Sequence, residues 1–295
     1  MDEFTTYHPI VNITYFVAVI GFSCGFMHPV CVGISLICGF LYSVMLGGRK
    51  TLKFNLVYML PLLIISALMN PAFNHEGVTI IMYLPDGNPL TLESILYGIC
   101  ASCMLISVIC WFSCFNKIIT SDKIMYLLGK IIPSLSLIFS MVLRFVPKFR
   151  TQIKTVSNAQ KSIGRDVSKA TLVSRVKNGI KILSIMITWS LENAIDTADS
   201  MKSRGYGLPD RTAYSNYNLS KRDVWVLFVI LMLALYILVS SFLGQTRFTF
   251  YPSVNGAEIT MGNIWVFLAY AMLCATPIII EVREAYKWKV LKSKI

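Results

Sequence analysis

The sequence predicts an all-α polytopic membrane protein with about six spans, from its composition, its apolar runs and the placement of its charges. Of its 295 residues, 55% are hydrophobic and 14% are charged, whereas a soluble domain has about 25% charged residues. A chain this apolar cannot cover itself with polar surface, so it needs the lipid bilayer as its solvent. Its net charge is +12, but the basic residues lie between and after apolar runs. The positive-inside rule explains that placement, so we expect no nucleic-acid partner.

Six apolar runs are the expected spans, because a bilayer core about 30 Å thick takes about 20 apolar helical residues. The first three runs are short for full spans. His28-Pro29 predicts a tight turn between the first two runs, because proline cannot continue a helix. Pro61 predicts a kink or a re-entrant shape in the third. The runs cover residues 10–26, 29–46, 54–69, 94–115, 224–243 and 261–280.

The basic residues set the expected orientation. The link 47–53 carries three of them, the segment 116–222 carries 18 Lys and Arg against 6 acidic residues, and five follow residue 280. The segment 70–93 carries none and the link 244–260 only Arg247. We therefore expect both termini in the cytoplasm and three regions: an N-terminal membrane domain (1–115, four spans), a cytoplasmic domain (116–222), and a C-terminal membrane domain (223–295, two spans and a basic tail).

The outer segment 70–93 is expected to contain a β-hairpin that caps helix ends. Residues 78–84 are β-branched and aromatic, and the turn sequence Pro85-Asp86-Gly87-Asn88 follows them. Residues 89–91 would form the returning strand.

The segment 116–222 is predicted to form several amphipathic helices. Residues 133–145 are mostly apolar, whereas 148–164 are basic with apolar residues at spacings of three and four, which places these on one face. Residues 167–179, 180–191 and 192–204 continue the pattern, and Gly205 with Pro209 ends it. Such helices could lie at the membrane interface and present an apolar face to a partner.

Two helix ends in this segment look alike. Each has an alanine, then two residues in the first and four in the second, then a small residue, a variable residue and glycine. A cation in the last turn can cap helix carbonyls or contact a partner, and physical reasoning alone leaves both interpretations open. The two ends are Ala159-Gln160-Lys161-Ser162-Ile163-Gly164-Arg165 and Ala198-Asp199-Ser200-Met201-Lys202-Ser203-Arg204-Gly205.

With these motifs the sequence resembles the transmembrane T component of energy-coupling factor (ECF) transporters, including the cobalt-transport Q-type branch. The resemblance runs from about residue 8 to 281. The family has two long cytoplasmic coupling helices, each ending in a short motif whose central arginine docks into a groove on an ATPase subunit. The matching pieces are Asn70-Pro71, Phe73-Asn74-His75, Leu143-Arg144-Phe145-Val146-Pro147, Ala159-Gln160 and the motif that ends in Ser203-Arg204-Gly205.

The resemblance implies ATPase contacts at both helix ends. Ser203-Arg204-Gly205 matches the second motif fully, whereas the first motif has Ile163 where the family has arginine. Either that ATPase contact is apolar, or Lys161 or Arg165 supplies the charge. A guanidinium can make a planar contact with several donors that lysine cannot copy. The residues assigned to ATPase coupling are Ala159, Gln160, Ser162, Ile163, Gly164, Arg165, Ala198, Met201, Ser203, Arg204 and Gly205.

The resemblance also implies the partners and the task. The chain would join two ABC-type ATPases and a small membrane substrate-binding subunit, the S component, in the plasma membrane of a prokaryote. Movement of the ATPases would pass through the coupling helices to the S component, which topples to deliver a vitamin or metal ion. ATP and Mg²⁺ would bind to partner subunits, and this chain would hold no cofactor. The expected S-component contacts are Ile153, Val156, Ile182, Ile185 and Met186.

Catalysis by this chain is not expected. The sequence has no G-x-x-x-x-G-K-[ST] motif, its three histidines lie far apart, and no Cys–His spacing predicts a metal site. Glu192, Asp196 and Asp199 could serve an intramembrane metal-dependent transferase, but such enzymes need two facing carboxylate clusters. We favour ion pairs between these acids and a neighbouring coupling helix. A membrane anchor or assembly factor, which would have no ATPase partner, is the other alternative.

Overall fold

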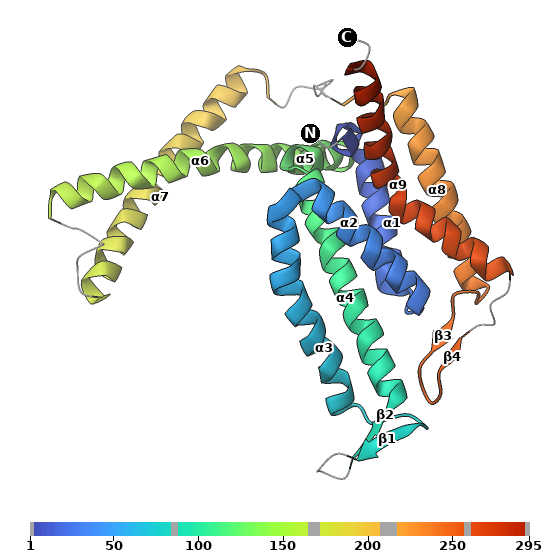
Figure 1. Ribbon diagram of the computed structural model, residues 1–295. Helices are drawn as coiled ribbons and strands as arrows, with labels where there is room; N and C mark the ends of the chain where they lie inside the picture. The colour runs from blue at the N-terminus through green and yellow to red at the C-terminus, as the bar shows by residue number, and fades with distance from the viewer. Residues whose placement is uncertain (1–2, 84–87, 165–171, 207–216, 257–260, 293–295) are drawn as a thin grey trace. The chain divides into compact units, whose positions relative to one another are not determined.

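The computed structural model describes residues 3–83, 88–164, 172–206, 217–256 and 261–292 (Figure 1). The chain divides into two compact units. The first, here called the membrane unit, combines Met1–Ile124 with Tyr217–Ile295. The second, the coupling unit, is Met125–Asn216. The segments predicted as N-terminal and C-terminal membrane domains therefore pack together in one unit.

The membrane unit is built from apolar helices, as the sequence predicts. Each of the six apolar runs lies within helical structure, and α4 packs against α1, α2 and α3, whereas α9 packs against α2 and α8. The fold prediction of an all-α polytopic membrane protein is confirmed. The elements are the 3₁₀ turn η1 (Glu3–Thr6), α1 (Pro9–Gly25), α2 (Pro29–Phe54), the π-helical turn η2 (Asn55–Met59), α3 (Leu60–Phe73), α4 (Leu92–Ile118), α8 (Lys221–Phe242) and α9 (Met261–Lys292).

Four helical stretches in the described part of the chain are long and apolar enough to cross a bilayer: Pro29–Phe73, α4, α8 and α9. The stretch Pro29–Phe73 contains two of the predicted runs, and Gly48 interrupts it with φ +60° and ψ −152°. Only glycine adopts this conformation at little cost, so the chain turns there and α3 runs back beside α4 (Figure 1). The remaining run forms α1, a shorter apolar helix.

Proline and histidine shape the helix boundaries. The predicted turn at His28-Pro29 is confirmed, because α2 begins at Pro29 and Nδ1 of His28 accepts a hydrogen bond from the backbone N–H of Val30 at 3.2 Å. His8 caps α1 in the same way through Ile10. Near Pro61, where the sequence predicts a kink or a re-entrant shape, the structure has the π-helical turn η2, which directly precedes α3. In a regular α-helix the N–H of residue 61 would donate to the carbonyl of Val57, and Pro61 has no N–H.

Aromatic rings and paired hydroxyls fill the core of the membrane unit. Trp111 is fully buried, and its Nε1 donates to Oγ of Ser35 at 3.0 Å. Ser35 is also 2.6 Å from Oγ of both Ser23 and Ser107, and Ser23 is 3.1 Å from the hydroxyl of Tyr270. This network joins α1, α2, α4 and α9. A polar group among apolar helices needs such a partner, because lipid offers none.

The hairpin predicted within the segment 70–93 is confirmed, whereas its place on the outer side of the membrane stays a prediction. Strand β1 (Ile80–Tyr83) pairs antiparallel with β2 (Pro89–Thr91), and Tyr83 lies opposite Pro89. Residues 84–87 of the predicted turn lie outside the described residues. A second small hairpin, β3 (Phe248–Thr249) with β4 (Asn255–Gly256), was not expected, because strands of two residues leave no alternating pattern in the sequence.

The coupling unit has fewer and longer helices than predicted. The sequence predicts residues 133–145 and 148–164 as separate segments, but α6 runs from Pro133 to Ser162 and includes Pro147. Internal proline removes only one backbone hydrogen bond, so a long helix can tolerate it at a cost in stability. The segments 180–191 and 192–204 also join, within α7 (Leu172–Ser203), whereas residues 165–171 lie outside the described part. Helix α5 (Ser121–Ile131) leads into this unit.

Candidate functional site: the wedge between α6 and α7

Helices α6 and α7 cross in the coupling unit in the form of an X (Figure 1). At the crossing, the rings of Phe149 and Trp189 meet edge to face, with centroids 5.5 Å apart. Among the described residues of the unit, Val156 and Met186 are the two buried apolar ones, at 9% and 5% exposure. The crossing is therefore a small aromatic and aliphatic contact between long helices.

Lys148 ties the two helices together beside this crossing. Its Nζ donates to Oδ1 of Asn193 on α7 at 2.7 Å and lies 5.3 Å from the ring centroid of Trp189. The same ammonium lies 5.9 Å from the ring centroid of Phe145 on its own helix. A cation over aromatic faces is attracted to them, and the hydrogen bond fixes which turn of α7 it meets.

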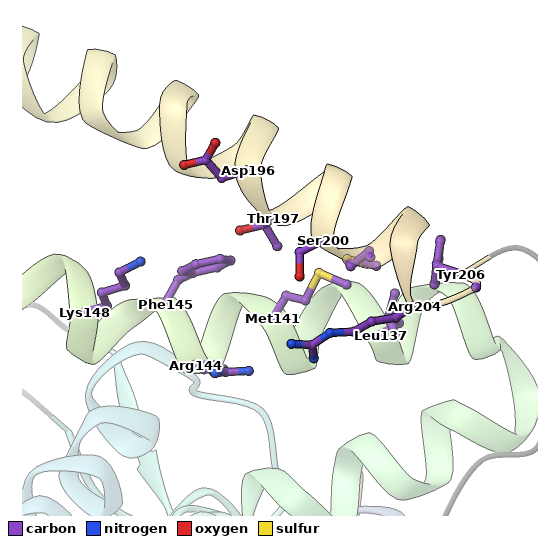
Figure 2. A pocket seen from close by; sticks show the side chains of 12 residues that line it. Leu137, Met141, Arg144, Phe145, Lys148, Asp196, Thr197, Ser200, Arg204 and Tyr206 are labelled. Carbon is purple, nitrogen blue, oxygen red and sulfur yellow. The ribbon is translucent and has the colours of Figure 1, made fainter.

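A cavity of about 780 Å³ opens between the N-terminal half of α6 and the C-terminal half of α7 (Figure 2). We call it the wedge. Arg144, Lys148 and Arg204 line it with a single acidic residue, Asp196, so its charge is net positive. A smaller cavity of about 340 Å³ lies against it, lined by Leu137, Met141, Phe145, Phe149, Trp189 and other mainly apolar residues. Basic groups thus adjoin an apolar surface, which suits a partner with acidic and apolar residues.

The C-terminal end of α7 is closed by its backbone. Gly205 has φ +77°, its N–H donates to the carbonyl of Lys202 at 3.0 Å, and the N–H of Tyr206 donates to the carbonyl of Met201 at 3.0 Å. This pair of bonds is the Schellman arrangement, which needs a left-handed residue and so favours glycine. Ser203 bonds the carbonyl of Ser200 at 2.9 Å.

Arg204 is therefore not needed as a cap. Within the described residues its guanidinium has no hydrogen bond or ion pair, and Figure 2 shows the side chain directed toward α6 within the wedge. Of the two interpretations that the sequence left open, capping of the helix carbonyls by the Arg204 side chain does not occur in this structure. A partner contact remains the prediction.

The C-terminal end of α6 shows the positive-φ glycine and one of the two backbone bonds found at the end of α7. Gly164 has φ +78° and donates to the carbonyl of Lys161 at 3.0 Å, and Ser162 bonds the carbonyl of Asn158 at 3.1 Å. Ile163 is 63% exposed at this end. Arg165, one of the two predicted substitutes for the missing charge, lies outside the described residues. An apolar side chain here occupies the sequence position that Arg204 occupies in α7.

The other predicted contact residues differ in accessibility. Ala159 is exposed and Gln160 is partly buried, with an Oε1 that has no hydrogen-bond partner within the described part of the chain. Ala198 and Met201 line the apolar cavity. Of the predicted S-component contacts, Ile153 and Ile185 are exposed and Ile182 is partly buried, whereas Val156 and Met186 are buried in the unit. These assignments stay predictions.

The structure adds residues that received no role from the sequence. Arg144, Lys148 and Tyr206 line the wedge, and Trp189 supports Lys148. The signal for them was present: Leu137, Met141, Arg144 and Lys148 recur at spacings of three and four, which places them on one face of α6. This continuous face is hard to recognise in the sequence, because Pro147 predicts a break between two separate helices.

Among the residues that the structure describes, the acidic residues of α7 do not form the predicted ion pairs. Among the described residues, no salt bridge joins Glu192, Asp196 or Asp199 to a neighbouring helix, and Lys148 bonds the amide of Asn193 instead. No group of three or more His, Cys, Asp or Glu residues suited to a metal ion occurs within that part of the chain.

Comparison with known proteins places these features in context. The model of a family described as cobalt transport protein (CbiQ) matches residues 8–214. The chain is also similar to energy-coupling factor transporter transmembrane proteins EcfT. It is 39% identical to that of Lactobacillus helveticus over 94 residues (32% of this chain, 34% of the relative). It is 34% identical to the protein of Bacillus selenitireducens over 111 residues (37% of this chain, 41% of the relative). It is 37% identical to the protein of Lactococcus lactis over 106 residues (35% of this chain, 40% of the relative). The matched segments thus span about a third to two fifths of these relatives.

Proposed function

The chain belongs to the cobalt transport protein family, and from this premise we propose that it is the transmembrane T component of an ECF transporter. Its partners would be two ABC-type ATPases and a small membrane S component that binds a vitamin or a metal ion. The chain itself would be non-catalytic. It would reside in the cell membrane with both termini in the cytoplasm, as its basic links suggest.

One observation carries the proposal. The end of α7 presents Ser203-Arg204-Gly205 with the helix closed by backbone bonds, and within the described residues the guanidinium of Arg204 has no partner, so it is available to another molecule. A guanidinium that neither caps its helix nor pairs with a carboxylate favours a docking contact. Gly205 has no side chain, so a partner backbone can approach the helix end closely.

The arrangement of α6 and α7 suits mechanical coupling. Each helix has 30 or more residues, and the two are joined near their middles by Phe149, Trp189 and Lys148. Helices are stiff along their axes, so a displacement applied at one end reaches the crossing without being absorbed locally. Movement of ATPases gripping the two C-terminal ends would thereby change the surface that the crossing offers to the S component.

The test is a charge reversal at the docking residue with a matched control. In Arg204→Glu, the contact would meet a repulsive charge in the ATPase groove, and truncating or reversing one partner of a buried charged contact costs about 2–5 kcal/mol. We therefore expect at least a tenfold fall in ATPase recovered with the tagged chain. Lys202→Glu makes the same charge change two residues away, outside the wedge, and should retain the complex. Unchanged recovery and uptake with Arg204→Glu would contradict the role of Arg204.

A further inference from the structure

Two guanidinium groups from different helices converge in the wedge. Arg144 lies on α6 and Arg204 lies at the end of α7, and both line the cavity of about 780 Å³. Figure 2 shows the two side chains extending toward one another from the facing helices. Because like charges repel at short range, this arrangement favours an anion between the two guanidinium groups.

The described part of the chain supplies no counter-ion to either arginine. No salt bridge or hydrogen bond of the Arg144 or Arg204 side chain occurs within it. Asp196 also lines the wedge, but it precedes Arg204 by eight residues, which is about 12 Å along an α-helix. Lys148 already donates to Asn193 at 2.7 Å. The wedge thus contains two cations whose counter-charge lies outside the described residues.

The floor of the wedge is apolar. Leu137, Met141 and Phe145 line it, and the same three residues line the adjoining cavity of about 340 Å³. A small inorganic anion would leave these side chains in water, whereas an acidic residue on an apolar stretch of polypeptide would cover them. Methionine is unbranched and adapts to neighbours of different shape. The wedge therefore suits a carboxylate side chain that has apolar neighbours.

The position of Arg204 indicates which molecule carries that carboxylate. In the function proposed above, Arg204 contacts an ATPase subunit, so a group that enters the wedge beside Arg204 is continuous with that interface. A guanidinium presents several N–H donors in one plane, and a carboxylate has two acceptor oxygens. One carboxylate can therefore bond both arginines at once.

We propose that an aspartate or glutamate of the ATPase enters the wedge and is held by Arg144 and Arg204 together. The proposal rests on the proposed function, which gives Arg204 its contact with the ATPase. It adds Arg144 as a second docking residue, and it adds a partner side chain that inserts between the helices. The ATPase is thereby tied to α6 as well as to the end of α7, so its movement acts on both helices at the wedge.

The test is a double-mutant cycle on the two arginines. The full-length tagged chain is purified from native membranes, stripped of the ATPase that copurifies with it, and titrated with that ATPase. We expect Arg144→Ala and Arg204→Ala each to lower the affinity by about tenfold or more, because each removes a hydrogen bond to a charged group. The double variant should lose less than the product of the two single effects, because both arginines hold one carboxylate.

Arg150→Ala is the matched control for Arg144→Ala. Arg150 is an exposed arginine on the same helix and lines neither cavity, so its removal should leave the affinity unchanged. Arg144 is also exposed, and the melting temperature of Arg144→Ala should equal that of the unaltered chain. Arg144→Lys keeps the charge without the planar set of donors, so it should restore only part of the affinity.

The outcomes separate this proposal from the proposed function. If Arg204→Ala weakens ATPase binding and Arg144→Ala does not, the shared carboxylate is overturned and the function stands. If neither variant weakens it, or if no ATPase copurifies with the unaltered chain, both are contradicted. Fully additive losses would show two separate contacts and would also overturn the shared carboxylate.

Photo-crosslinking asks directly whether the ATPase enters the wedge. The photoreactive residue p-benzoylphenylalanine is placed either at Met141, on the floor of the wedge, or at the next residue, Val142. Val142 is 50% exposed and lines neither cavity. We expect a crosslink to the ATPase from position 141 and none from position 142. A crosslink from position 141 to lipid or to this chain itself, with none to the ATPase, would overturn the proposal.

Discussion

The ammonium of Lys123 donates to the backbone carbonyl of Thr5 at 2.7 Å, although Lys123 is only 3% exposed. In the amide orientation that satisfies both neighbours, Asn12 also accepts from Lys123 at 2.7 Å and donates to the carbonyl of Phe4 at 3.1 Å. Lys123 lies next to the point where the chain leaves the membrane unit, after Ile124. The N-terminal turn η1 therefore holds that exit in place.

The turn η1 also contacts the segment in which the chain re-enters the membrane unit after the coupling unit. Arg222 donates to Oγ1 of Thr6 at 3.3 Å, and its guanidinium lies 4.1 Å from the ring centroid of Tyr7. Arg222 follows the re-entry of the chain at Tyr217 by five residues. Lys123 and Arg222, which flank the coupling unit in the sequence, thus both contact one short segment of the membrane unit.

Lys123→Met should destabilise the membrane unit. The change keeps most of the apolar stem but removes a hydrogen bond from a charged donor, which is worth about 1.5–3 kcal/mol. We expect the melting temperature to fall by several degrees, and hydrogen exchange of residues 3–12 to increase. Lys292→Met, at the exposed end of α9, should change neither. Unaltered exchange at the N-terminal turn in Lys123→Met would refute the anchoring role.

Gly205→Ala should weaken the end of α7. At φ +77° an L-residue with a side chain is disfavoured by about 1–2 kcal/mol. Faster hydrogen exchange at residues 200–206 would report the fraying of the last turn. Gly179→Ala is the matched control, because Gly179 lies inside the same helix with open space around its Cα; there alanine should stabilise by about 0.4–1 kcal/mol. Equal effects at both glycines would count against the closed helix end.

Ile163→Arg asks whether the end of α6 works through an apolar contact. Ile163 is 63% exposed, so the chain's own stability should change by less than about 0.5 kcal/mol. We expect ATPase recovery to fall, because a guanidinium would have to be desolvated in a groove suited to isoleucine. Val176→Arg is the control, since Val176 is exposed to the same 63% on α7. Full recovery of the ATPase with Ile163→Arg would show that this position tolerates charge.

Ser35→Ala should cost more than an ordinary serine substitution. Ser35 contacts Trp111, Ser23 and Ser107, so its removal leaves three buried polar groups, on α1 and α4, short of a partner. We expect a loss of more than about 2 kcal/mol in the free energy of unfolding. Ser66→Ala removes a hydroxyl that bonds only a carbonyl of its own helix, at 3.4 Å, and should be nearly neutral. Similar losses for the two variants would argue against the network.

Local patterns in the sequence predicted much of this fold. Hydropathy located the apolar helices, because each run must satisfy its backbone internally in lipid. His28-Pro29 predicted a turn, and Pro85-Asp86-Gly87-Asn88 predicted a hairpin, because these residue types restrict the backbone dihedral angles wherever they occur. The motif ending in Gly205 predicted a helix stop, and its positive φ confirms the reason.

Features that depend on tertiary neighbours were not predicted. Pro147 predicts a helix break, but α6 continues without interruption on both sides of this residue. The wedge needs Arg144 and Arg204, which are 60 positions apart in the sequence, to lie on facing helices. The sequence places Lys123 among the basic residues of the predicted cytoplasmic segment. Its burial follows from its contact with the N-terminal turn, which the sequence does not reveal.

The central claim, that this chain is the coupling subunit of an ECF transporter, is tested most directly by what accompanies it from native membranes. The tagged chain would be extracted in mild detergent and its companions identified by mass spectrometry. The account predicts one or two P-loop ATPases together with a small, strongly apolar membrane protein. Recovery of the chain alone, or with proteins unrelated to these, would contradict it.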